Sequence, residues 1–222
     1  MEQAKTDHKL GELLFKYRDY TPIPFIILMV AFANADLLSL QVGGMMVLLG
    51  EIIRTKGVAY IGGVSRTRSY SLGTKVVTGG PFAHVRNPLY WGNFFLSTGL
   101  VVIANVAWLE PQFHGFNLAF IAAFIFFFFG QYHFIINWEE ENLTKVFGEQ
   151  FLNYKSKVGR WVPNLLPADF SVEGEEKEEQ IEGDYKMAIK SEKNTLMIAI
   201  TITLLILWRS GFFSTAAVAA GA

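Results

Sequence analysis

Long apolar runs constrain this chain more than any other feature. Five of them approach the length of about 20 residues that a helix needs to cross a bilayer. They are roughly Pro22 to Leu40, Val42 to Tyr60, Leu89 to Trp108, Phe116 to Ile136 and Leu196 to Phe213. The second is the most interrupted, because Glu51 and Arg54 fall inside it. The sequence therefore predicts an all-α polytopic membrane protein with about five transmembrane helices.

The composition agrees with a membrane protein and excludes several kinds of site. Of the 222 residues, 51% are hydrophobic and only 18% are charged, which is more apolar than a soluble domain of this size needs. The net charge of -1 gives no general attraction to nucleic acid. Because the chain has no cysteine, disulfides and thiolate metal sites are excluded.

Positive charge is unevenly distributed and predicts the orientation. Lys and Arg cluster before the first apolar run, after the second and after the fourth, whereas the short turns near Asp36 and Glu110 contain none. Only Arg209, near the end of the last run, departs from this pattern. Lys and Arg in short loops stay cytoplasmic. We therefore expect a cytoplasmic N-terminus, a C-terminal tail on the opposite side, and cytoplasmic polar segments at Ile61–Pro88 and Asn137–Asn194.

The two parts of the second polar segment differ in pattern. Residues 169–193 are acidic and lack an apolar period, which predicts a solvated linker. Residues 137–167 carry apolar side chains at helical spacing opposite a charged face, which predicts an amphipathic helix that continues from the fourth span. We expect Pro163 to stop this helix soon after Arg160. Glu139, Glu140 and Glu141 would point in three directions, so at most two can face a common site.

Two motifs resemble the membrane methyltransferase superfamily that contains isoprenylcysteine carboxyl methyltransferases and phospholipid N-methyltransferases. The first motif precedes the third apolar run, and the second follows the fourth. The matching residues of the first are Gly80, Pro81, Phe82, Arg86, Asn87, Pro88, Tyr90 and Gly92. Those of the second are Glu139, Glu140, Leu143, Phe147, Gly148, Phe151, Tyr154, Val158, Arg160, Trp161 and Pro163. The resemblance covers most of the stretch from Gly73 to Pro163.

The resemblance implies S-adenosylmethionine as the methyl donor, a cytoplasmic cofactor-binding cap and a lipid-like acceptor that enters from the bilayer. The acceptor could be a prenylated carboxylate, a phospholipid amine or another isoprenoid lipid. No metal is implied. The implied catalytic residues are Arg86, Glu140 and Arg160. The implied cofactor-binding residues are Arg86, Asn87, Pro88, Tyr90, Gly92, Glu139 and Glu140, with Glu140 in the strongest role.

Chemical reasoning suggests how these groups would act. The glutamates can hold the cofactor's ribose hydroxyls or its ammonium group, and Arg86 can hold its carboxylate. Arg160 could instead face the acceptor's head group, or pair with Glu149 or a lipid phosphate. Glu51 and Arg54 are spaced for a salt bridge at a helix end. His133, Asn137 and Glu141 share a helix face, and metal binding there is not expected.

The resemblance divides the chain and leaves two alternatives. We expect an N-terminal segment with the first helical hairpin (1–61), a methyltransferase core (62–168), an acidic linker (169–194), and a C-terminal transmembrane helix with its tail (195–222), which is a candidate contact for a partner protein. Asn87 replaces the family's histidine and cannot carry a proton. The alternatives are an NADPH-dependent sterol-type reductase relative, whose membrane domain would be larger than this chain, and a non-catalytic membrane subunit with a degenerate cofactor site.

Overall fold

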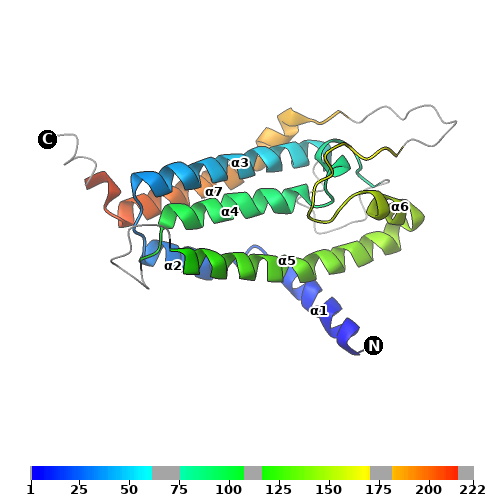
Figure 1. The fold of residues 1–222 in the computed structure, drawn as a ribbon, viewed down its shortest axis with the longest axis horizontal. Coiled ribbons are helices and arrows are strands. Elements are labelled where there is room, and N and C mark those ends of the chain that lie inside the picture. Colours follow the sequence, from blue (N-terminus) through cyan, green and yellow to red (C-terminus); the bar gives the residue numbers. More distant parts are fainter. Residues whose placement is uncertain (1, 62–75, 108–116, 171–181, 215–222) are drawn as a thin grey trace. The chain divides into compact units, whose positions relative to one another are not determined.

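A computed structural model describes residues 2–61, 76–107, 117–170 and 182–214 (Figure 1). These residues form α-helices and one 3₁₀ helix, η3. The elements are α1 (Glu2–Tyr17), α2 (Ile23–Ala31), α3 (Leu37–Ile61), η3 (Gly80–Ala83), α4 (Pro88–Ala104), α5 (Leu118–Phe147), α6 (Glu149–Lys157) and α7 (Tyr185–Arg209). Much of the predicted loop after α3, the turn near Glu110, the middle of the acidic linker and the C-terminal tail lie outside the described residues.

The predicted all-α membrane architecture is confirmed. Helices α3, α5 and α7 are long and apolar enough to cross a membrane, and α4 is a shorter apolar helix of 17 residues. The described residues contain no β-strand, and they contain one isolated parallel β-bridge, between Val85 and Gly159. Four of the five predicted runs therefore fall largely within helices.

The prediction of one continuous span over residues 22–40 is wrong. The nine-residue helix α2 ends at Ala31, and α3 begins only at Leu37. Asp36 and Ser39 explain the new start, because the Ser39 amide donates to Asp36 Oδ1 at 2.7 Å and the Asp36 amide donates to Ser39 Oγ at 2.9 Å. This reciprocal cap satisfies amides that the first turn of a helix leaves without partners. The sequence carried this signal inside the apolar run.

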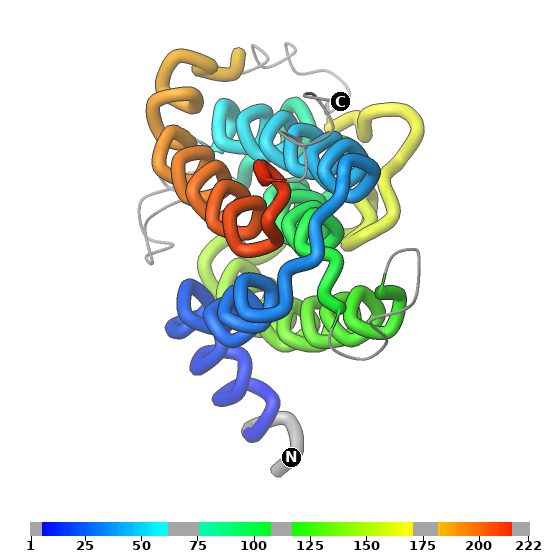
Figure 2. The backbone as a smooth tube through the Cα atoms, turned by 90° about the vertical axis from the view of Figure 1, so that its left-hand side faces the viewer, coloured from blue at the N-terminus to red at the C-terminus, as the bar shows by residue number. Residues whose placement is uncertain are grey.

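The chain forms two compact units, each built from segments distant in sequence. Unit 1 comprises Met1–Gly50, Phe94–Ile136 and Asn194–Ala222, and unit 2 comprises Glu51–Asn93 and Asn137–Lys193. In unit 1 α2 packs on α5 through aromatic side chains, with the ring centroids of Phe25 and Phe124 5.2 Å apart. Figure 2 shows these two helices side by side.

Close packing of α3 on α4 in unit 1 depends on two glycines. A Cβ on Gly99 would lie 2.6 Å from the Gly43 carbonyl oxygen and 2.8 Å from the Val47 amide nitrogen. A Cβ on Gly43 would lie 2.8 Å from the Ile103 amide nitrogen. The two backbones therefore approach more closely than any larger residue allows, as membrane helices do where small residues face each other.

In unit 2 the start of α7 packs on the end of α3, which corrects the predicted linker. The Asp184 amide donates to the Ala59 carbonyl at 2.9 Å, and Ala188 is fully buried against Val58 and Ala59. Residues 185–193 therefore belong to a packed helix rather than to a solvated linker. The start of α7 cannot be recognised in the sequence, because Tyr185–Lys193 is rich in charge like the acidic stretch before it.

A buried polar cluster reinforces this contact. Arg54 Nε donates to Glu192 Oε2 at 2.8 Å, and Arg54 Nη1 donates to the side-chain oxygen of Asn93. Glu192 is only 2% exposed. The ion pair described for Arg54 joins it to Glu192, 138 residues away, and the pair with Glu51 that the sequence spacing suggested stays a prediction.

The glycine contact in unit 1 yields a matched pair of variants. We expect Gly43→Ala to lower the free energy of unfolding by about 1–3 kcal/mol, because an added methyl group overpacks the helix crossing. Gly44→Ala is the control, since a Cβ there meets nothing within 4 Å and alanine favours a helix over glycine by about 1 kcal/mol. Thermal unfolding in detergent micelles measures both. Equal stability of the two variants would contradict the packing described here.

Candidate functional site

The two sequence motifs lie against each other in unit 2. Backbone groups of residues 82–86 pair with the segment that follows α6, beginning with the Arg86 amide, which donates to the Gly159 carbonyl at 2.9 Å. Three further bonds extend the contact: Asn164 N to His84 O at 2.8 Å, Ala168 N to Ala83 O at 2.9 Å, and Tyr154 Oη to Phe82 O at 2.9 Å. Segments more than 70 residues apart in sequence thus form one surface.

The second motif is not one continuous helix. Helix α5 ends at Phe147, Gly148 adopts a positive φ of 52°, and α6 then runs from Glu149 to Lys157. Glycine suits this turn because side chains with a Cβ disfavour that backbone conformation. The helix ends before Arg160 and not after it as predicted, since Val158 is already extended and Gly159 pairs with Val85. This end frees Arg160 to turn back toward α5.

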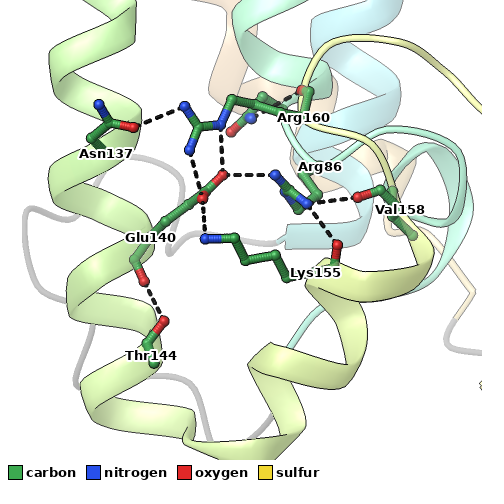
Figure 3. Close-up of polar contacts among 8 residues, drawn as sticks. Arg86, Asn137, Glu140, Thr144, Lys155, Val158 and Arg160 are labelled. Atoms are coloured by element: carbon green, nitrogen blue, oxygen red, sulfur yellow. Dashed lines mark hydrogen bonds and ion pairs between the residues drawn. The ribbon is translucent and has the colours of Figure 1, made fainter.

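The carboxylate of Glu140 lies at the centre of the site (Figure 3). Its Oε1 accepts from Arg86 Nη2 at 3.1 Å and from Arg160 Nε at 3.0 Å. Its Oε2 accepts from Arg160 Nη2 at 2.8 Å and pairs with Lys155 Nζ at 2.9 Å. The two-point contact with Arg160 is the geometry that makes arginine–carboxylate pairs strong. Both oxygens of Glu140 are therefore paired with cations, which come from the first motif (Arg86), from α6 (Lys155) and from the segment after α6 (Arg160).

These cations keep Glu140 ionised although it is buried. Burial alone raises the pKa of the Glu140 carboxyl, because removing water disfavours the charge. Hydrogen bonds from Arg160 and Lys155, together with the charges of Arg86 and Arg160, outweigh burial and hold the pKa below its ordinary value. Glu140 follows the apolar part of α5, which ends near Ile136. It is therefore an anion across the neutral pH range.

Arg86 is the most buried of the three cations. Its Nη1 donates to the carbonyls of Val158 at 2.7 Å and Lys155 at 2.9 Å, and its Nη2 donates to Glu140. Its Nε is buried and has no hydrogen-bond partner among the described residues. A buried donor without an acceptor costs free energy, so a hydrogen bond from a ligand acceptor to this nitrogen would remove that cost.

The three adjacent glutamates face different partners, as their helical spacing predicted. Glu139 Oε2 accepts from the hydroxyl of Tyr90 at 2.7 Å, which joins the start of α4 to α5. Glu141 points to solvent and pairs with Lys145 at 2.8 Å on an exposed face. Glu139 and Glu140 thus reach the first motif, whereas the ion pair described for Glu141 stays within α5.

Asn87, at the position of the family's histidine, has a structural partner. Its Nδ2 donates to the Arg160 carbonyl at 3.1 Å, so it ties the first motif to the backbone beside the arginine. A neutral imidazole N–H could make the same bond, and no proton transfer is needed for it. Pro88 is the buried first residue of α4, and Gly92 is buried in the same helix one turn later.

The structure adds two side chains that sequence reasoning did not assign to the site. Lys155 pairs with Glu140, and Asn137 Oδ1 accepts from Arg160 Nη1 at 2.8 Å. Asn137 lies three residues before Glu140 on α5, so its helical spacing could have indicated a shared face. Lys155 could not be found in this way, because the turn at Gly148 redirects α6. The described residues contain no group of His, Asp and Glu that could hold a metal ion.

The position of Glu140 predicts a pH effect on stability. Because its pKa is lowered in the folded protein, its contribution is complete above its ordinary pKa of about 4.5 and is lost as the pH falls below that value. We expect wild-type protein to lose more thermal stability than Glu140→Gln between about pH 6 and about pH 3.5. Glu141→Gln is the matched control and should follow the wild type. An equal loss in Glu140→Gln would contradict the assignment.

Comparison with known proteins identifies the family. A family model described as phospholipid methyltransferase matches residues 38–150, slightly more than half of the chain. This range contains the first motif, and from the second motif it contains Glu139 and Glu140. No curated protein and no solved structure matches the chain. The resemblance inferred from the two motifs is confirmed, and the chain belongs to the phospholipid methyltransferase family within the integral membrane methyltransferase superfamily.

Proposed function

We propose that this protein transfers a methyl group from S-adenosylmethionine to a lipid acceptor, and that the cluster around Glu140 forms part of the cofactor site. One observation carries the proposal: the Nε of Arg86 is a buried donor with no partner among the described residues. It lies within the pair of motifs that the family shares. A ligand with an anionic oxygen acceptor would satisfy this group.

The charge of the cluster favours an anionic ligand group. Arg86, Lys155 and Arg160 surround the one carboxylate of Glu140. Three cations around one anion leave excess positive charge where burial weakens screening by water. The amino-acid carboxylate of S-adenosylmethionine has the charge and the acceptor oxygens that this excess requires. The residues present therefore fit the cofactor that the family implies.

The contacts of Glu140 suggest a positioning role for it. Both of its oxygens are already engaged, and it holds Arg86 and Arg160 in fixed directions. We propose that Glu140 acts through these arginines, with Arg86 contacting the cofactor directly. Glu139 accepts a hydrogen bond from the Tyr90 hydroxyl at the start of α4, and we propose that its carboxylate also binds the cofactor's ammonium or ribose groups.

Bound S-adenosylmethionine supplies a methyl group on a positively charged sulfur, which an electron pair of the acceptor can displace. The protein then has to align the acceptor and exclude water. The fixed side chains at the start of α4 suit alignment, because Asn87 and Tyr90 are each tied to the second motif. Arg160 is 25% exposed at its side chain, and we propose that it meets an acceptor's anionic head group.

The family description favours a phospholipid amine among the acceptors considered. An ammonium group must lose its proton before it can attack, whereas a carboxylate is already nucleophilic near neutral pH. The distribution of Lys and Arg supports a cytoplasmic site, where the soluble cofactor is available. Asn87 does not favour a degenerate site, because its bond to the Arg160 carbonyl needs only an N–H donor.

Cofactor binding to purified protein tests the proposal. We expect saturable binding of radiolabelled S-adenosylmethionine, and we expect Arg86→Lys to weaken it at least about tenfold, about 1.4 kcal/mol. Lysine keeps the positive charge but lacks the Nε donor and the planar fork of arginine. Lys145→Gln is the control, because Lys145 pairs with Glu141 on the exposed face of α5.

The result is informative only if each variant is folded, which thermal unfolding in the same detergent establishes. If folded wild type binds the cofactor and Arg86→Lys binds it equally well, the cofactor does not contact Arg86. Absence of binding by folded wild type would contradict the cofactor itself.

A further inference from the structure

The segment that follows Arg160 exposes apolar side chains in an irregular stretch of chain. Val162 is 78% exposed, Leu165 is 99% exposed and Leu166 is 79% exposed. We call residues 161–167 the apolar loop. Exposed leucines on α3, α5 or α7 are expected because those helices are apolar enough to meet lipid. The apolar loop belongs to no helix and follows the charged helix α6, so its exposure requires another explanation.

Hydrogen bonds fix the apolar loop in the outward position. The Asn164 amide donates to the His84 carbonyl at 2.8 Å, and Asn164 Nδ2 donates to the Lys157 carbonyl at 2.9 Å. Beyond the loop, the Ala168 amide donates to the Ala83 carbonyl at 2.9 Å. The polar backbone thus faces η3 and the first motif, and the leucines are left on the other side. The exposure is a consequence of the fold and not of a loose chain.

The first motif also sets the level of the apolar loop relative to the start of α4. Trp91 Nε1 donates to the Trp161 carbonyl at 2.8 Å, and the two indole rings meet edge to face with centroids 6.0 Å apart. Trp91 lies in the first turn of α4, where its apolar run begins. Tryptophan is enriched where membrane helices pass from lipid to water. The Trp91–Trp161 pair therefore indicates that the loop lies at the lipid–water boundary.

Charged groups beside the apolar loop fit the same location. Lys155 and Lys157 are exposed on α6, and Lys157 Nζ also lies 5.3 Å from the centroid of the Phe170 ring. Lysines beside exposed leucines and a tryptophan are typical of surfaces that lie in the headgroup region, where anionic lipids attract the cations. A protein partner would not require the loop to be level with the start of an apolar helix.

We propose that the apolar loop inserts Val162, Leu165 and Leu166 into the boundary between lipid headgroups and acyl chains. The partner is the bilayer itself. Arg160 directly precedes the loop in the chain, so the inserted loop would hold lipid next to Arg160. This inference rests on exposure and hydrogen bonding in unit 2, and it stands whether or not the cofactor proposal holds.

Because the natural chain contains no cysteine, a single introduced cysteine can be labelled specifically. We would label Leu165→Cys with an environment-sensitive fluorophore and reconstitute the full chain into vesicles of phosphatidylcholine and phosphatidylserine. Asn153→Cys, an exposed polar position on α6, is the matched control. We expect the label at 165 to emit at shorter wavelength and to be quenched by lipids brominated in their acyl chains. The label at 153 should show neither effect.

Two outcomes would overturn the proposal. A label at 165 that stays in water, with emission like that at 153, would show that the loop does not contact lipid. A label that is shielded from water but not quenched by brominated lipid would show that protein covers the loop, either a second copy or another segment of this chain. Radiolabelled cofactor binding to the same vesicles reports separately on the proposed function.

Discussion

The ion pairs of Glu140 are the interaction on which the site in unit 2 depends. A buried carboxylate is costly unless it is paired, and here it is paired with cations that come from three places: Arg86 before α4, Lys155 on α6 and Arg160 beyond α6. Removal of one partner from a buried pair typically costs about 3–5 kcal/mol, because the other charge is left unpaired. Keeping the three cations in place is thus important for the stability of this region, which is also a candidate binding site.

The same cluster explains why the two motifs occur together. Backbone bonds between residues 82–86 and the segment after α6 bring the motifs into register, and Glu140 then holds the arginine of each motif. The turn at Gly148 makes this possible, because it separates α6 from α5 and returns the chain toward the first motif. Motif residues such as Phe151, Tyr154 and Val158 are buried structural residues in this arrangement. The motifs therefore combine buried residues that position the chain with charged residues that meet in the candidate site.

Sequence reasoning predicted the local features and missed those that depend on distant contacts. Apolar runs predicted the all-α membrane class, and the motifs predicted the family and two of the residues that meet around Glu140, Arg86 and Arg160. The break at Asp36 was missed because one capping pair lowers the mean hydropathy of a long apolar run only slightly. The helical start of α7 was missed because its burial depends on Val58 and Ala59, far away in sequence. The pairing of Arg54 with Glu192 and the role of Lys155 were missed for the same reason.

A structure of the protein in lipid nanodiscs with S-adenosylhomocysteine, the demethylated form of the cofactor, is the most direct test of the account. The account predicts that the ligand carboxylate accepts a hydrogen bond from Arg86 Nε while Arg160 still donates to both oxygens of Glu140. A ligand located away from Arg86 would contradict it. A Glu140 carboxylate that releases Arg160 and contacts the ligand directly would also contradict it.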